Sequence, residues 1–123
     1  MQDGRLAQAL SLRPLCRLED IPDGQAKGFS PAAGFVGLFA VRQGGRVFAY
    51  VNACPHIGVA LDIMPDRFLN HRGTAIICAL HGASFRIEDG FCTQGPCAGD
   101  TLEAVPTEVD EDGTVWVPED AGA

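Results

Sequence analysis

Two short segments of the chain each place a cysteine and a histidine within a few residues of each other. Cys54-Pro55-His56 has the form C-x-H, and Cys78-Ala79-Leu80-His81 has the form C-x-x-H. Thiolates and imidazoles are ligands that proteins use for Zn²⁺ and for the irons of some iron–sulfur clusters. Because the chain has five cysteines and three histidines among 123 residues, two such pairs rarely arise by chance. The candidate metal ligands are therefore Cys54, His56, Cys78 and His81.

The order of these donors along the chain bears on which metal they hold. Zinc fingers usually take two cysteines from one segment and two histidines from another. Here each segment supplies one cysteine and one histidine. That order suits two unlike irons, one bound by both thiolates and the other by both imidazoles. Zn²⁺ remains the alternative, and a zinc protein would show neither visible absorption nor a paramagnetic signal after reduction.

The elements around the two pairs predict short strands joined by tight turns. Each pair follows an expected strand, and a glycine, Gly58 or Gly82, comes soon after it. Loops tethered by strands hold ligands rigidly, and glycine lets backbone amides approach closely. The pattern predicts an all-β fold of antiparallel sheets, a sandwich or small barrel, with a disordered tail after Pro118. The expected strands are 35–41, 47–51, 75–77, 84–87, 91–92, 102–109 and 115–117, with hairpin turns at 42–46, 88–90 and 112–113.

Composition limits the class of protein and its partners. A chain of 123 residues that is 46% apolar fits one domain with its own core. Nine basic and 16 acidic residues give a net charge of −7, which argues against nucleic acid or an anionic membrane and favours a basic surface on another protein. No run approaches the ~18–20 apolar residues of a membrane span. The polar start, Met1 to Arg5, is unlike a secretory signal, so a cytoplasmic location is expected.

From about Gly34 to Val117 the sequence resembles the Rieske iron–sulfur proteins, because it carries their C-x-H and C-x-x-H motifs and a similar Gly95-Pro96 loop. The resemblance implies one Rieske-type [2Fe–2S] cluster, with Cys54 and Cys78 on the inner iron and His56 and His81 on the outer iron. It implies that the proline loop covers the cluster. It also implies one domain over residues 1–123, with a cluster-binding subdomain at about 52–98 and a base subdomain at about 12–51 and 99–118. The spacer of residues 57–77 is slightly longer than is usual in such ferredoxins.

Residues near the ligands separate this chain from the high-potential members of that family. Those proteins have two further cysteines that form a disulfide, where this chain has Val59 and Leu80. They also have Ser and Tyr hydroxyls after the second histidine, where this chain has Ala83 and Phe85. Fewer hydrogen bonds to cluster sulfur make reduction harder. The resemblance therefore implies a low-potential centre, toward the roughly −150 mV end of the Rieske range.

Other residues have less specific interpretations. An odd number of cysteines does not predict a disulfide framework. Cys92 and Cys97 are either a redox-labile disulfide or cluster-tuning thiol, or simply two small core or loop residues. We expect the last, with Cys97 nearer the cluster. Cys16 is expected to be buried and His71 to be a solvated loop residue. The sequence also predicts that Tyr50 and Trp116 are core aromatics with a polar end.

Three functions are consistent with this pattern. The first is a soluble ferredoxin that carries single electrons from a flavin reductase to a terminal oxygenase or another redox enzyme. The second is a Rieske subunit or module of a larger oxidoreductase, and the third is a structural or regulatory domain that does not use the redox chemistry. Beyond the four candidate ligands only His71 remains, so a mononuclear iron site with two histidines is not expected. No flavin or nicotinamide fingerprint is present either, so the chain is not expected to be catalytic by itself.

Overall fold

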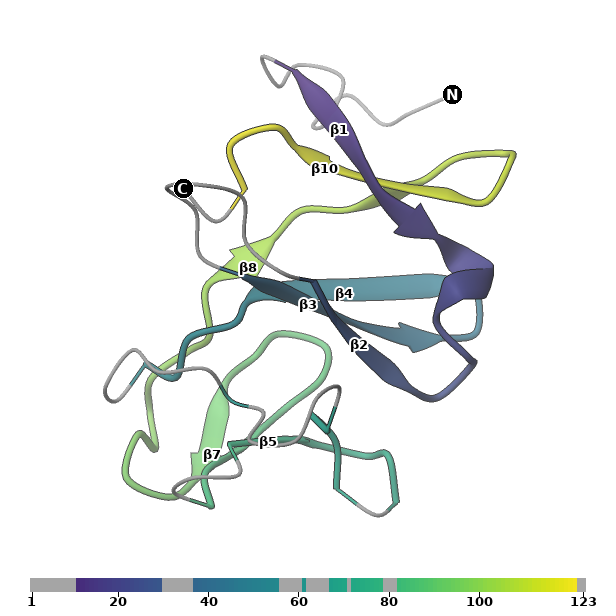
Figure 1. The fold of residues 1–123 in the computed structure, drawn as a ribbon. Coiled ribbons are helices and arrows are strands. Elements are labelled where there is room, and N and C mark those ends of the chain that lie inside the picture. Colours follow the sequence, from purple (N-terminus) through teal and green to yellow (C-terminus); the bar gives the residue numbers. More distant parts are fainter. Residues whose placement is uncertain are drawn as a thin grey trace.

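A computed structural model describes residues 11–29, 37–55, 61, 67–70, 72–78 and 82–121. These residues form three antiparallel sheets, which Figure 1 shows one below another. The central sheet has the order β2-β3-β4-β8, the sheet above it has the order β1-β10-β9, and the sheet below has the order β5-β6-β7. The strands are β1 (Leu12–Arg17), β2 (Ala26–Phe29), β3 (Leu38–Gln43), β4 (Arg46–Val51), β5 (Ile76–Ile77), β6 (Ser84–Phe85), β7 (Cys92–Gln94), β8 (Ala104–Val105), β9 (Glu108–Val109) and β10 (Thr114–Pro118).

The central sheet is buried on both faces, and the alternation of side chains along β3 divides them between two cores. Leu38 and Ala40 join the core on the side of β10, whereas Phe39 and Val41 join the core on the opposite side. Successive residues of a strand point to opposite faces. A strand that is covered on both faces therefore has consecutive apolar residues in its sequence, as β3 has at residues 38–41.

The predicted all-β fold and its hairpins are confirmed. β3 and β4 pair from Leu38↔Val51 to Gln43↔Arg46, so a two-residue Gly44-Gly45 turn joins them. Gly44 has φ +65°, a conformation that glycine adopts without strain. β6 pairs with β7, and β9 pairs with β10, as predicted.

The predicted strand 102–109 is wrong in one respect, because two separate strands occupy it. β8 pairs with β4 in the central sheet, and only β9 forms the hairpin with β10. Pro106 lies between them and has no N–H for a ladder. The predicted disordered tail is also wrong for residues 119–121: the Glu119 N–H donates to the Ser11 carbonyl at 2.9 Å, and Ala121 is buried.

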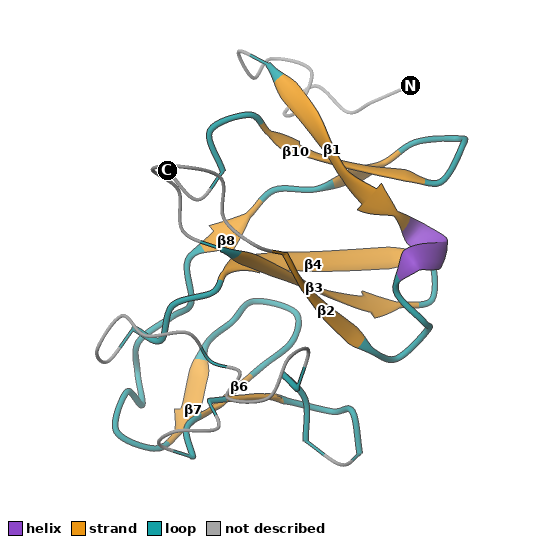
Figure 2. Cartoon of the chain, in the orientation of Figure 1, coloured by secondary structure: helices purple, strands orange, loops and turns teal. Residues whose placement is uncertain are grey.

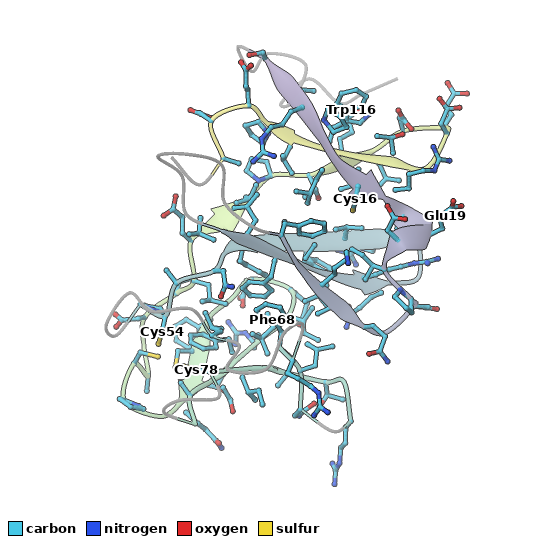
Figure 3. All side chains as sticks on the ribbon, viewed as in Figure 1. Cys16, Glu19, Cys54, Phe68, Cys78 and Trp116 are labelled. Carbon is cyan, nitrogen blue, oxygen red and sulfur yellow. The ribbon has the colours of Figure 1, made fainter. Side chains whose placement is uncertain are left out.

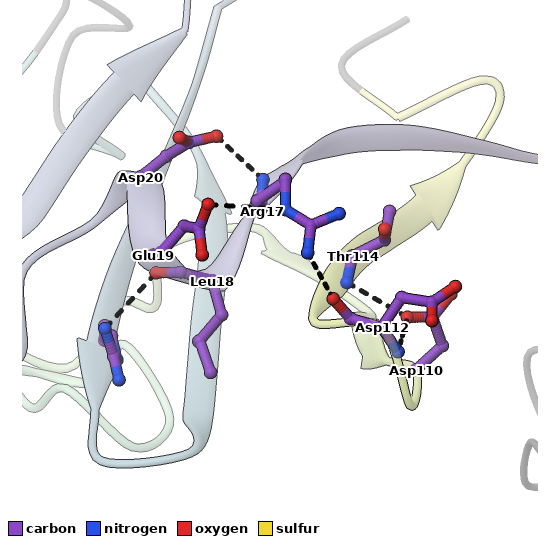
Figure 4. A network of polar contacts seen from close by, with 8 residues as sticks. Arg17, Leu18, Glu19, Asp20, Asp110, Asp112 and Thr114 are labelled. Atoms are coloured by element: carbon purple, nitrogen blue, oxygen red, sulfur yellow. Dashed lines mark hydrogen bonds and ion pairs between the residues drawn. The ribbon is translucent and has the colours of Figure 1, made fainter.

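The 3₁₀ helix η1 (Leu18–Asp20) connects β1 toward the central sheet and is the one helix of the described residues. Figure 4 shows two hydrogen bonds of Arg17, the last residue of β1: its guanidinium donates to the Asp112 carbonyl in the β9–β10 turn, and its N–H donates to Asp20 Oδ2 of η1 at 2.8 Å. The Leu18 N–H also donates to the Gly113 carbonyl at 2.7 Å. Over the described ranges, no helix is long and apolar enough to cross a membrane.

Candidate metal centre

Both predicted cysteine ligands lie deep in the lower core. Cys54 follows β4 and is 1% exposed, and Cys78 directly follows β5 and is 0% exposed. They belong to one cluster of buried side chains, and Figure 3 shows them close together beside the lower sheet. The predicted histidine ligands, His56 and His81, lie outside the described residues, as does His71. The described residues contain no group of three or more Cys, His, Asp or Glu side chains placed to hold a metal.

Asn52 fixes the segment that carries Cys54. Its N–H donates to the Gly37 carbonyl at 2.8 Å. Its side-chain Oδ1 accepts a hydrogen bond from the Leu61 N–H, also at 2.8 Å. One residue therefore ties the end of β4 to a point nine positions further on. No motif in the sequence marks Asn52, although asparagine at the end of a strand commonly bonds to nearby backbone.

The segment that carries Cys78 is closed by its own backbone. The Cys78 N–H donates to the Ala83 carbonyl at 2.9 Å, and the Gly82 N–H donates to the Cys78 carbonyl at 2.8 Å. Gly82 has φ +72°. Glycine adopts this backbone conformation without strain, which explains the glycine that follows this ligand segment. These two hydrogen bonds hold Cys78 and Ala83, which lie between β5 and β6, at a fixed separation.

The Gly95-Pro96 loop presses against the second ligand segment. Gly95 has φ +101°, and a Cβ built on it would lie 2.6 Å from the Ala83 Cα atom. No side chain fits at that distance, so the two backbones meet without one between them. Further hydrogen bonds, from Cys92 N–H to the Asp100 carbonyl at 2.8 Å and from Gly99 N–H to the Cys92 carbonyl at 3.1 Å, attach the loop to β7.

Cys92 and Cys97 are buried free thiols with their Sγ atoms 3.1 Å apart. Both side chains are buried in the lower core, and the expectation that they have no redox role stays a prediction. Burial, then the Cys92 and Cys54 side chains, raise the pKa of Cys97 to about 12. Cys97 is therefore a neutral thiol with the predicted ligand Cys54 among its neighbours.

Aromatic side chains join the lower core to the central sheet. Tyr50 on β4 is 2% exposed, and its hydroxyl donates to the Ile87 carbonyl at 2.6 Å. Phe39 on β3 stacks on Phe68 with ring centroids 4.5 Å apart. Desolvation raises the pKa of Tyr50, so its hydroxyl stays protonated. The predicted core position of Tyr50 is confirmed, whereas Trp116 is only half-buried and donates from Nε1 to Asp110 Oδ2.

Comparison with known proteins identifies this arrangement. The family of the Rieske [2Fe-2S] domain matches residues 11–108. The chain belongs to this family. A search of curated proteins gave no match.

Solved structures of a ferredoxin and of oxygenase–ferredoxin complexes are similar to this chain. The chain is 25% identical to the ferredoxin of carbazole 1,9a-dioxygenase from Nocardioides aromaticivorans, with a TM-score of 0.69 over 87% of this chain and 96% of that one. It is equally similar to a chain in a complex of reduced oxygenase and oxidized ferredoxin of carbazole 1,9a-dioxygenase, of which it covers 92%. A chain in another such complex is 22% identical with a TM-score of 0.71, but only 28% of that chain is covered.

A Rieske domain holds one [2Fe–2S] cluster, which accepts and donates one electron at a time. The described residues fit this cofactor in the chemistry of their donors. The two thiols lie in a core whose other described members are apolar apart from the Tyr50 hydroxyl and the thiols of Cys92 and Cys97. Such a core keeps water from the sulfur atoms and lowers the local dielectric, which are conditions that tune a Rieske centre.

Proposed function

We propose that this Rieske chain is a ferredoxin that takes single electrons from a flavin reductase and passes them to a terminal oxygenase. The observation that carries the proposal is the match to a ferredoxin over most of both chains, 87% of this one and 96% of the other.

The proposed ligands are Cys54 and Cys78 for the inner iron and His56 and His81 for the outer iron. The burial of both thiols supports an inner position for the iron that they bind. Hydrogen bonds of the chain fix the position of the two proposed cysteine donors. Asn52 anchors the segment that carries Cys54, and the hydrogen bond from Cys78 to Ala83 fixes the segment that carries Cys78. Fixed ligands keep the structural change on electron transfer small.

We also propose that residues 52–98 form a cluster-binding subdomain on a base subdomain of 12–51 and 99–118. The β5-β6-β7 sheet supports this division, because all its residues come from the first range. The described strands of the other two sheets come from the second range.

The partner surfaces are proposed to be basic, because the chain carries a net charge of −7. Opposite charges accelerate the encounter of two proteins, and the interfaces of electron carriers are small and transient. We also propose that the protein is a soluble, cytoplasmic carrier that binds neither nucleic acid nor membrane.

The midpoint potential is proposed to lie toward about −150 mV, at the low end of the Rieske range. Ala83 and Phe85, where high-potential members have hydroxyls, are both fully buried. Neither side chain can donate a hydrogen bond. A midpoint well above zero at neutral pH would contradict this part of the proposal.

Spectra of the purified protein before and after dithionite test the proposal directly. We expect visible absorption in the oxidised protein and a low-temperature paramagnetic resonance signal after reduction. Cys54→Ser and Cys78→Ser should lose most of the bound iron, whereas Cys16→Ser, which changes the half-buried Cys16 of the upper region, should keep it. Colourless protein with full zinc occupancy would refute the proposal.

The second candidate is a Rieske subunit or module of a larger oxidoreductase. The same fold occurs within a chain of which it makes up only about a quarter, since 28% of that chain is covered. Stoichiometric copurification with a large redox subunit would favour this candidate over a free carrier.

A further inference from the structure

Cys92 and Cys97 are two buried cysteines to which the proposed function gives no role. They are 0% and 2% exposed, in the core that also contains the proposed ligands Cys54 and Cys78. Both are free thiols, and their Sγ atoms are 3.1 Å apart. The sequence alone favoured two residues without a redox role and left a disulfide as the alternative. The distance between the two sulfur atoms favours that alternative.

The chain turns back on itself between these two cysteines, which brings their side chains together. The Gly99 N–H donates to the Cys92 carbonyl at 3.1 Å, and the Cys92 N–H donates to the Asp100 carbonyl at 2.8 Å. These backbone hydrogen bonds hold the loop of residues 95–99 beside β7. Because an S–S bond is about 2.05 Å long, the two sulfurs need to approach by only about 1 Å from their 3.1 Å separation.

The other three cysteines do not compete for this pair in the holoprotein. Cys54 and Cys78 are the proposed ligands, so iron holds their sulfurs when the cluster is bound. Cys16 packs against the core on the opposite side of the central sheet. Each of the two thiols therefore has the other as its available partner.

We propose that Cys92 and Cys97 form a reversible disulfide when the protein meets a low-molecular-weight disulfide such as oxidised glutathione. One cysteine attacks the oxidant and forms a mixed disulfide, and the other cysteine then displaces the remaining half of the oxidant. Each cysteine loses one proton and one electron as the new S–S bond forms. The S–S bond of the oxidant breaks, and the oxidant leaves as two thiols that carry both protons and both electrons.

Burial determines how this pair responds to an oxidant. Because both sulfurs are closed off from solvent, the oxidant reaches them when the loop of residues 95–99 opens. The loop is held by the Asp100 N–H, which donates to the Cys97 carbonyl at 2.9 Å, and by the packing of Gly95 on Ala83. A disulfide would attach the loop to β7 covalently and oppose further opening. Reducing thiols, which keep cytoplasmic cysteines reduced, would reverse it.

Peptide mapping of the holoprotein distinguishes this disulfide from every other cysteine pairing. Trypsin cleaves after Lys and Arg, and neither occurs after Arg86, so Cys92 and Cys97 fall in one peptide, residues 87–123. Arginines separate the other three cysteines into three other peptides. After incubation with oxidised glutathione, acid quenching and alkylation of the unfolded protein, the peptide should carry no alkyl group and lack two hydrogens. Treatment with dithiothreitol should restore alkylation of both cysteines.

Hydrogen exchange of the loop gives a second readout, which other forms of thiol oxidation would not move in the same way. Exchange of the Gly99 and Asp100 N–H groups should slow by about threefold or more after oxidation, and dithiothreitol should reverse the change. Cys92→Ser and Cys97→Ser should each abolish the slowing. Cys16→Ser, which changes a cysteine outside the pair, should keep it. The peptide masses of the wild-type protein decide the question even where a variant fails to fold.

Alkylation of both cysteines after the incubation, a retained glutathione, or a cross-link from the peptide 87–123 to another cysteine would overturn the inference. Equal loop exchange in the oxidised and reduced proteins would overturn the proposed effect on the loop. The visible spectrum of the same samples reports the cluster separately. A missing cluster would therefore refute the proposed function, whereas an intact cluster without the disulfide would refute the role of this cysteine pair.

Discussion

The two cores on either side of the central sheet differ in composition and in how they are held. The upper core, between the central sheet and β1-β10-β9, consists mainly of small aliphatic side chains such as Val47, Ala49, Val115 and Val117. The lower core contains the four buried cysteines and the buried aromatics Phe39, Tyr50, Phe68 and Phe85. The same strand, β3, supplies residues to both.

The backbone differs between the two regions as well. In the upper sheet, β1 and β10 have six and five residues and pair along almost their full length. In the lower sheet, β5 and β6 have two residues each, and Figure 2 shows that turns and loops make up most of that region. The upper region is thus stabilised by the hydrogen bonds between its paired strands and by the burial of its apolar side chains. The lower region has fewer ladder hydrogen bonds, and the two proposed cysteine ligands lie in its core. We therefore expect its stability to depend on the metal, because metal binding couples directly to folding.

Of the changes considered, removal of iron should have the largest effect on stability, and this effect should be confined to the lower region. Treatment with a chelator under reducing conditions should lower the hydrogen-exchange protection of residues 76–94 by about tenfold or more. The strands β1, β3, β4 and β10 should change much less, because their ladders do not include the ligand segments. Hydrogen exchange measured by mass spectrometry resolves the two regions, and an equal loss in both would contradict the comparison.

Gly95→Ala should damage the lower region more than the loss of any one hydrogen bond there. The added Cβ would lie 2.6 Å from the Ala83 Cα atom, at φ +101°. We expect a loss of about 2–4 kcal/mol in the free energy of unfolding, from strain and overpacking together. Gly99→Ala is the control, because Gly99 has φ +94° but a Cβ added there would have nothing within 4 Å, and it should cost about 1 kcal/mol. Urea titration compares them, and equal losses would show that close packing on Ala83 is unimportant.

Tyr50→Phe should weaken the link between the lower core and the central sheet. The buried Tyr50 hydroxyl donates to the Ile87 carbonyl at 2.6 Å, and its removal leaves that carbonyl without this donor. The expected loss is about 1–2 kcal/mol in the free energy of unfolding. Trp116→Phe is the matched change in the upper region, because Nε1 donates to Asp110 at 2.8 Å on a half-buried side chain, and it should cost less. A larger loss from Trp116→Phe would reverse the comparison.

The smallest expected effect is an acid dependence of the upper region. The Trp116 Nε1–H and then the Thr114 N–H hold the pKa of Asp110 below its usual value, and the Arg17 charge adds to the shift. The Asp110 carboxylate therefore contributes stability that is present above its unfolded-state pKa and is lost as the pH falls through the lower folded-state pKa. Stability measured through Trp116 fluorescence should decline slightly below about pH 4. The decline should be reduced in Asp110→Ala, and an unchanged acid profile in that variant would show that other groups cause it.

The sequence predicted the hairpins most successfully where turn residues and apolar alternation agree. Gly44-Gly45 between two apolar runs defined β3 and β4, and Asp112-Gly113 defined the turn before β10. β1 was not predicted, because Pro14 and two arginines interrupt its pattern. β1 tolerates the proline as an edge strand of its sheet. β2, with Ala26, Lys27 and Gly28, has little intrinsic strand propensity and forms by pairing with β3.

The sequence by itself determined the family and predicted the metal donors, because C-x-H and C-x-x-H after short strands restrict which atoms can bind a metal. Only the tertiary structure decided which other residues surround those donors. Asn52 bonds to Leu61, nine positions away, and Gly95 packs on Ala83 across the β6–β7 connection. The physical reason is that ligand identity is a local property of the chain, whereas the hydrogen bonds and packing around a ligand form only when distant segments fold against each other.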